Sequence, residues 1–212
     1  MAVPGVASAH NPPDPPTDID ILNYALTLER LEAAFYRRVL DKFGEREFEN
    51  ANIFDGLGPY VRNHTYENFK RISRHENTHV ATLVSVIKSL GGRPVPASKY
   101  DFGITGVGSA VRTAQVLENT GVKAYDGAIA HIEKAKLLTA GATIATVEAR
   151  HASYLNLLNH DIPFPAVFDR AVAPRTICET VRDSFIVSPP KPYGPYKSLT
   201  ALCNRLPGRP TP

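Results

Sequence analysis

The sequence contains two E-x-x-H patterns, Glu76 to His79 and Glu148 to His151. Both lie in stretches with helical periodicity, and residues three apart on a helix share one face. Each pattern can therefore direct a carboxylate oxygen and an imidazole nitrogen, both metal-ligand atoms, to the same point. One such pair alone is common on solvated helix faces and would bind a metal ion poorly. Two pairs on facing helices, joined by further carboxylates, can hold two metal ions.

Two further glutamates have matching surroundings. Glu29 and Glu118 each follow a leucine and precede a tyrosine, Tyr36 and Tyr125 respectively, by seven residues, two helical turns along one face. The order along the chain is thus Glu, E-x-x-H, Glu, E-x-x-H, and the two single glutamates are expected to bridge the ions. The predicted metal ligands are Glu29, Glu76, His79, Glu118, Glu148 and His151. Four buried carboxylates without a cation would cost several kcal/mol per ion, which two divalent cations would offset.

Glu32 leaves one assignment open. It lies one turn beyond Glu29 and could itself be the ligand, an additional ligand, or a partner of a histidine ligand. We prefer Glu29, because its spacing to a tyrosine matches that of Glu118, and take Glu32 as the candidate catalytic proton carrier. Tyr36 and Tyr125 are expected to hydrogen-bond bridging carboxylates or to act as radical sinks. The plainer interpretation is that they are inward tyrosines with satisfied hydroxyls.

Four amphipathic helices would carry these residues. Thr17 or Asp18 would cap the first, whose apolar residues recur at three- and four-residue spacing as far as Gly44. The other three are predicted over residues 60–90, 109–132 and 136–159, with a polar connector over residues 45–58.

The segment between Gly91 and Gly108 contains glycine and proline and has no helical period. About 18 residues can extend up to roughly 60 Å, which exceeds the roughly 40 Å length of a helix of about 27 residues. The second and third helices can therefore run parallel. We predict an all-α four-helix bundle with a long crossover between helices 2 and 3.

Proline-rich segments flank this bundle. Residues 1–16 contain five prolines and are predicted to be a flexible tail, and residues 17–168 form the bundle. Residues 169–212 are predicted to be a C-terminal extension with one short helix, over residues 176–185. The last part, residues 188–212, contains seven prolines and is expected to wrap the bundle or hang free.

Composition excludes several classes of function. Hydrophobic residues make up 43% of the chain and charged residues 21%, as in a soluble globular protein, and the net charge is only +3. Lysine and arginine are scattered among acidic residues, so no nucleic acid is expected as a partner. No apolar run approaches the roughly 18 to 20 residues that span a bilayer. We expect a monomer or a small homo-oligomer.

Two signals bear on the compartment. Cys178 and Cys203 are the only cysteines, and a disulfide between them could staple the irregular C-terminal part. Asn63-His64-Thr65 is a glycosylation sequon. Residues 1–16 lack the charged region and the apolar region that an intact signal peptide contains, although a signal peptide could have been removed ahead of Met1. Together these features indicate the secretory pathway or an extracellular location.

Several longer motifs resemble the ferritin-like superfamily, and within it the desiccation-related ferritin-like branch. They are ILNYAL at residues 21–26, LERLEAAFY at 28–36, HENTHV at 75–80 and VEARHA at 147–152. The similarity covers residues 18–168. The alternating ligand order is also that of ferritin-like di-iron and di-manganese bundles, and the branch is similar to manganese catalases.

This resemblance implies a two-metal oxidoreductase that consumes hydrogen peroxide, of catalase or peroxidase type, in oxidative or desiccation stress protection. The ligand set suits manganese, iron and zinc alike. The two expected metal ions are manganese, with iron or zinc as alternatives. The expected small substrate is hydrogen peroxide or dioxygen. The alternatives are a ferroxidase or iron-binding protein, and a stress-protective structural protein with a structural metal.

Overall fold

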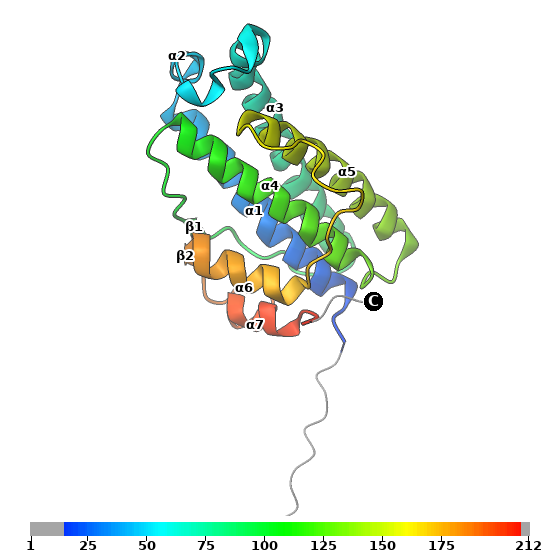
Figure 1. Ribbon diagram of the computed structural model, residues 1–212. Helices are drawn as coiled ribbons and strands as arrows, with labels where there is room; N and C mark the ends of the chain where they lie inside the picture. The colour runs from blue at the N-terminus through cyan, green and yellow to red at the C-terminus, as the bar shows by residue number, and fades with distance from the viewer. Residues whose placement is uncertain (1–14, 209–212) are drawn as a thin grey trace, which may run out of the picture.

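The computed structural model describes residues 15–208, whose secondary structure is almost entirely helical. Four long helices form the bundle shown in Figure 1: α1 (Asp18–Lys42), α3 (Gly58–Ser89), α4 (Val107–Ile129) and α5 (Ala135–Leu158). Shorter elements connect and cover them: α2 (Glu45–Glu49), the 3-10 helix η1 (Asn52–Phe54), β1 (Lys99–Tyr100), α6 (Pro174–Phe185), β2 (Ile186–Ser188) and α7 (Leu199–Arg205). The predicted all-α fold class is confirmed. Within the described residues, no helix combines the length and apolar character that crossing a membrane requires.

Helix α1 is buried on most of its surface. A capping box holds its first turn: the Asp20 N–H donates to Thr17 Oγ1 at 3.2 Å, and the Thr17 N–H donates to the Asp20 carboxylate at 2.9 Å. This capping starts the helix where the sequence predicts it. Apolar side chains on successive turns, among them Leu31, Phe35 and Val39, are buried in the core and orient the helix within the bundle.

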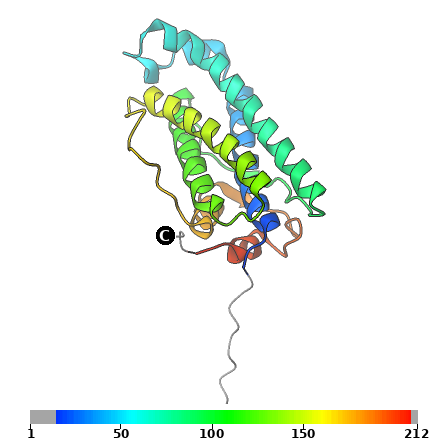
Figure 2. The same ribbon diagram turned by 90° about the vertical axis from the view of Figure 1, so that its right-hand side faces the viewer.

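The chain between α3 and α4, residues 90–106, runs back along the length of the bundle. Figures 1 and 2 both show α4 starting at the end where α3 starts, so these two helices run parallel, whereas α1 and α5 run the opposite way. Helix α1 packs along α3, and α4 packs along α5. The predicted long crossover is confirmed. Each antiparallel pair contains one helix with an E-x-x-H pattern, α3 in the first pair and α5 in the second.

Residues 45–58, predicted as a polar connector, contain α2 and η1, and α3 begins at their last residue. Phe48 and Phe54 are fully buried there, and the ring centroids of Phe48 and Phe69 of α3 lie 5.0 Å apart. Burial of two aromatic rings stabilises ordered structure in this short segment. The sequence does not predict these elements, because five residues in α2 and three in η1 are too few to display a helical period.

The C-terminal segment, residues 169–208, covers one side of the bundle. Helix α6 contacts α4 and α1, and α7 contacts α6 and α1. The prediction of a single short helix in residues 169–212 is wrong, because α7 follows α6. Ser198 caps α7 by accepting a hydrogen bond from the Ala201 N–H at 3.1 Å, and Leu202 and Cys203 are fully buried. Strand β2 pairs antiparallel with β1 of the crossover, so this segment wraps the bundle.

A disulfide joins α6 to α7. It links Cys178 and Cys203, 25 residues apart in sequence, as predicted. Such a bond is compatible with an oxidising, secreted location. Residues 1–14 of the predicted flexible tail lie outside the described residues.

Candidate metal centre

The four long helices bring the six predicted ligands together. Glu29 comes from α1, Glu118 from α4, and one E-x-x-H pair from each of α3 and α5. All four glutamates are 0% exposed. Their ligand atoms form two overlapping groups, in each of which all atoms lie within 4.8 Å of one another: Glu29, Glu76, His79 and Glu148; and Glu76, Glu118, Glu148 and His151. This buried cluster could hold two metal ions.

The glutamates that belong to both groups are Glu76 and Glu148. The sequence pattern predicts Glu29 and Glu118 as the bridging residues, whereas the structure puts each of these in one group only. The difference arises because the E-x-x-H glutamates reach across the bundle toward the histidine of the opposite helix. Spacing along one helix reports which face a residue occupies, but not how far its side chain extends toward the other helices.

The two histidines turn the same ring atom toward the carboxylates. His79 Nδ1 lies 3.2 Å from a Glu29 oxygen, 3.3 Å from a Glu76 oxygen and 3.2 Å from a Glu148 oxygen. His151 Nδ1 lies 3.1 Å from a Glu118 oxygen and 3.2 Å from the other Glu76 oxygen. Each Nδ1 atom therefore occupies a position from which it can bind an ion held by the surrounding carboxylates.

Burial and crowding shift the pKa values of these groups strongly. Burial and the charge of Glu118 raise the pKa of Glu148 well above its ordinary value. Burial would also raise the pKa of Glu76, but the neighbouring imidazoles of His151 and His79 lower it to about 2. Burial would lower the pKa of both histidines, but their carboxylate partners raise it to about 12 for His79 and about 9 for His151. In the metal-free protein, protons thus balance the carboxylate charges.

Three carboxylate oxygens have no partner in hydrogen-bond geometry within the described structure, although the Nδ1 atoms of His79 and His151 lie 3.2 Å from two of them, Glu148 Oε1 and Glu76 Oε1 respectively. They are both oxygens of Glu148 and Oε1 of Glu76, and all three are buried. Buried carboxylate oxygens without a donor are costly, and each needs a partner. They belong to the two residues that the ligand groups share. Together with the imidazole nitrogens they fit two divalent first-row ions.

The two tyrosines connect α1 and α4 crosswise. The Tyr36 hydroxyl of α1 donates to Glu118 Oε1 at 2.5 Å, and the Tyr125 hydroxyl of α4 donates to Glu29 Oε1. Each tyrosine therefore orients the glutamate of the opposite helix, through the carboxylate oxygen that it binds. The matching Glu-to-Tyr spacing in the sequence corresponds to this pair of reciprocal contacts.

Glu32 lies beside the cluster and belongs to neither ligand group. A Cβ atom placed on Gly121 would lie 3.0 Å from Glu32 Oε1 and 3.1 Å from Glu148 Oε2, so the glycine leaves room for both carboxyl groups. Burial and the charge of Glu148 raise the pKa of Glu32 well above its ordinary value. Of the two candidates on α1, Glu29 therefore has the position of a ligand, and Glu32 that of a buried neighbour with a raised pKa.

His75 is a functional candidate that the sequence analysis missed. Its side chain is exposed, yet its Nδ1 lies 2.9 Å from Nε2 of His151. The two rings stack, with centroids 5.2 Å apart and an angle of 15° between planes. No spacing rule could reveal this contact, because the two histidines lie on different helices and are 76 residues apart in sequence.

Comparison with known proteins agrees with this architecture. A family model described as a ferritin-like domain matches residues 17–160, which include the six candidate ligands and both tyrosines. A search of curated proteins finds no match. The matched segment spans the four long helices and ends before α6. Since it covers more than half of the sequence, the chain belongs to the ferritin-like family.

Proposed function

We propose that this protein is a two-metal oxidoreductase that consumes hydrogen peroxide, of catalase or peroxidase type, with manganese as its metal. The observation that carries the proposal is the pair of overlapping ligand groups, whose shared residues Glu76 and Glu148 have buried oxygens without hydrogen bonds. Two adjacent redox-active ions supply the two electrons that reduce a peroxide. The donor atoms suit manganese, iron and zinc, and the resemblance to manganese catalases favours manganese.

The residues of the chain would hold the ions, exclude bulk water and deliver protons. Reduction of one hydrogen peroxide to two water molecules takes up two protons as well as two electrons. Glu32 is buried, and burial together with the neighbouring carboxylates raises its pKa, which favours its protonated form in the metal-free protein. Its position beside Glu148 supports a role as the donor of a proton to a substrate oxygen.

In the catalase form of this reaction, a second hydrogen peroxide returns the two electrons and two protons and leaves as dioxygen. Two peroxides then yield two waters and one dioxygen, whereas a peroxidase would take the electrons from another donor. We assign this activity to protection against oxidative or desiccation stress in the secretory pathway or outside the cell. The Cys178–Cys203 disulfide and the exposed Asn63 of the sequon support that location.

The test is peroxide consumption and dioxygen release by purified, manganese-loaded protein. A Glu76→Ala, His79→Ala double variant removes one shared ligand and one histidine and should lose the activity. Glu67→Ala is the control, because this glutamate lies on the same helix and pairs with Lys70 at the surface. Wild-type protein that turns over peroxide no faster than the double variant would refute the function. Parallel loading with ferrous iron tests the iron-oxidising alternative.

A further inference from the structure

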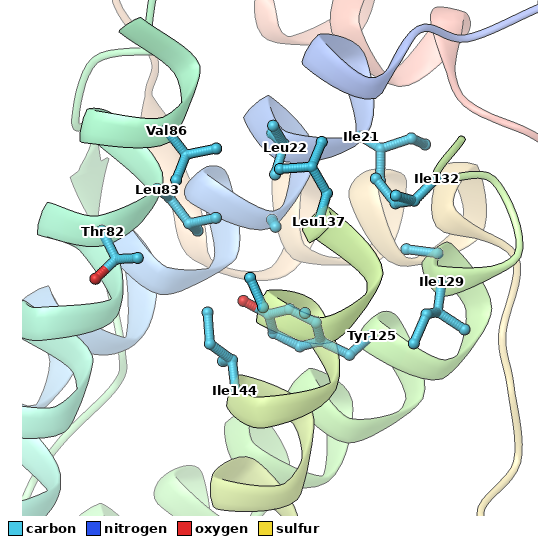
Figure 3. Close-up of a pocket in the computed structure, with 14 residues that line it drawn as sticks. Ile21, Leu22, Thr82, Leu83, Val86, Tyr125, Ile129, Ile132, Leu137 and Ile144 are labelled. Carbon is cyan, nitrogen blue, oxygen red and sulfur yellow. The ribbon is translucent and has the colours of Figure 1, made fainter. Parts of the chain in front are cut away.

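Figure 3 shows the side chains that line an apolar cavity between the four long helices, which is partly open to solvent beside the exposed Thr82. All four long helices contribute to its lining. Ala25 lines it one turn before Glu29 on α1, and Ile144 lines it one turn before Glu148 on α5. Tyr125 of α4 also lines it, and this is the residue whose hydroxyl donates to Glu29. The cavity and the ligand groups therefore share the Tyr125 side chain as a boundary.

The lining disfavours polar guests. It consists mostly of isoleucine, leucine, valine and alanine side chains, and its two side-chain hydroxyls belong to Thr82, which is exposed, and to Tyr125, which is already bonded. The cavity volume is about 50 Å³, room for a few small molecules, because one water needs about 10–15 Å³. Apolar cavities stay dry, and hydrogen peroxide would lose the hydrogen bonds of both its hydroxyls there. An uncharged, apolar diatomic molecule makes no hydrogen bonds in water and therefore loses none on entering the cavity.

We propose that this cavity binds dioxygen beside the metal centre. The inference rests on the proposed function, in which a second hydrogen peroxide loses two electrons and two protons and becomes dioxygen. That product is apolar and small enough for the cavity, whereas peroxide and water are not stabilised in it. The cavity thus withdraws the product from the ligand groups into a space that the polar substrate does not enter.

Xenon is a suitable probe, because it binds in dry apolar cavities without hydrogen bonds. Gly141 of α5 lines the cavity, and a Cβ atom added to it meets no atom within 4 Å. Gly141→Leu should therefore fill the cavity while replacing a helix-interior glycine by a better helix former. Ala142→Leu adds a leucine at the next position of the same helix, outside the lining, and is the matched control. Leu137→Ala enlarges the cavity instead.

We expect xenon-129 NMR and xenon-pressurised crystals to show xenon in the cavity of the wild type and of Ala142→Leu. Gly141→Leu should abolish this site, and Leu137→Ala should raise its xenon affinity several-fold. Leu137→Ala keeps the test decisive if Gly141→Leu does not fold. A wild-type cavity without xenon, or xenon binding that neither lining variant alters, would overturn the proposal.

Activity measurements separate dioxygen as product from dioxygen as reactant. If it is the product, manganese-loaded wild type consumes peroxide in dioxygen-free buffer. Gly141→Leu then releases dioxygen several-fold more slowly at unchanged metal content, and Ala142→Leu matches the wild type. A strict requirement for added dioxygen would overturn its assignment as product. Xenon in the wild-type cavity but not in Gly141→Leu, without any peroxide consumption, would refute the proposed function and leave the apolar binding site standing.

Discussion

At the scale of single residues, the buried glutamates should differ in what their removal does to metal binding. Glu148 belongs to both ligand groups, whereas Glu118 belongs to one. Glu148→Ala should therefore abolish the binding of both ions. Glu118→Ala should keep one, because the group around His79 stays complete. Metal content after equilibrium dialysis checks both variants, and two ions retained by Glu148→Ala would contradict its shared position.

His75 should act on one ion through His151. A hydrogen bond between their rings fixes which nitrogen of His151 carries the proton and leaves Nδ1 free for a metal. His75→Phe keeps a ring in place but removes this bond, so we expect the affinity for one of the two ions to fall by about 10- to 100-fold. His75→Asn should restore part of the loss.

Calorimetric titration of manganese, which resolves the two affinities, measures this effect. His64→Phe is the control, because His64 lies exposed on the same helix and, among the partners described, contacts only Tyr60, through its backbone oxygen and its ring. If His75→Phe lowered the affinity for both ions equally, the ring would support the bundle in general and not His151 in particular.

The sequence could predict the residues whose relation lies within one helix. Glu76 with His79, and Glu148 with His151, are pairs at i and i+3, and helical geometry alone brings such pairs to one face. The contact of His75 with His151, and the sharing of Glu76 by both groups, depend on distances between helices. These distances follow from side-chain packing of the whole core, which has no short-range signature in the chain.

At the scale of elements, Asp20 joins the start of α1 to the C-terminal segment. Its carboxylate accepts hydrogen bonds from the Tyr196 hydroxyl at 2.8 Å and from Arg205 at 3.0 Å, besides closing the capping box with Thr17. Burial would raise the pKa of Asp20, but the bonds from Thr17, Tyr196 and Arg205 lower it below the ordinary 3.8. The ionised group therefore stabilises the fold above about pH 4, and this contribution is lost as the pH falls through the lowered pKa.

Asp20→Asn should lower the free energy of unfolding by about 1 to 3 kcal/mol near pH 7, since it removes charged hydrogen bonds. The difference from wild type should shrink as the pH falls toward about 3. Urea unfolding at several pH values measures it. Asp183→Asn, in an exposed pair with the neighbouring Arg182, should change little. A difference between Asp20→Asn and wild type that stays constant with pH would show that the charge is not its cause.

The ends of the long helices were predictable because local chemistry sets them. Thr17 and Asp20 form a capping box that depends only on residues three apart. Helix α7 was not predictable in this way, because a helix of only seven residues between prolines is stabilised by burial against α1 and α6 and by the disulfide. The pairing of β1 with β2 likewise joins segments that are distant in the chain.

At the scale of the whole molecule, protons and metal ions compete for the same buried cluster. Burial raises the pKa of Glu29 to about 7, and the carboxylates around His79 outweigh its burial and raise its pKa to about 12. Both raised values mean that bound protons stabilise the metal-free fold, and that this stabilisation declines as the pH rises above the unfolded values of about 4.3 and 6.5. Metal ligation needs both groups without protons, so metal affinity changes with pH in the opposite direction.

Manganese should therefore stabilise the bundle more at pH 8 than at pH 6. At a free concentration of 100 times the dissociation constant, each site adds about 2.7 kcal/mol to the free energy of unfolding. Thermal unfolding with manganese and with a chelator, across this pH range, measures the gap between the two melting temperatures. Glu148→Ala, which should bind neither ion, controls for effects of manganese elsewhere on the protein. The gap should widen with pH because it depends on the apparent metal affinity, which rises as the protons that compete for Glu29 and His79 leave the metal-free cluster. A gap that narrows toward pH 8 would mean that the cluster binds protons in preference to metal ions.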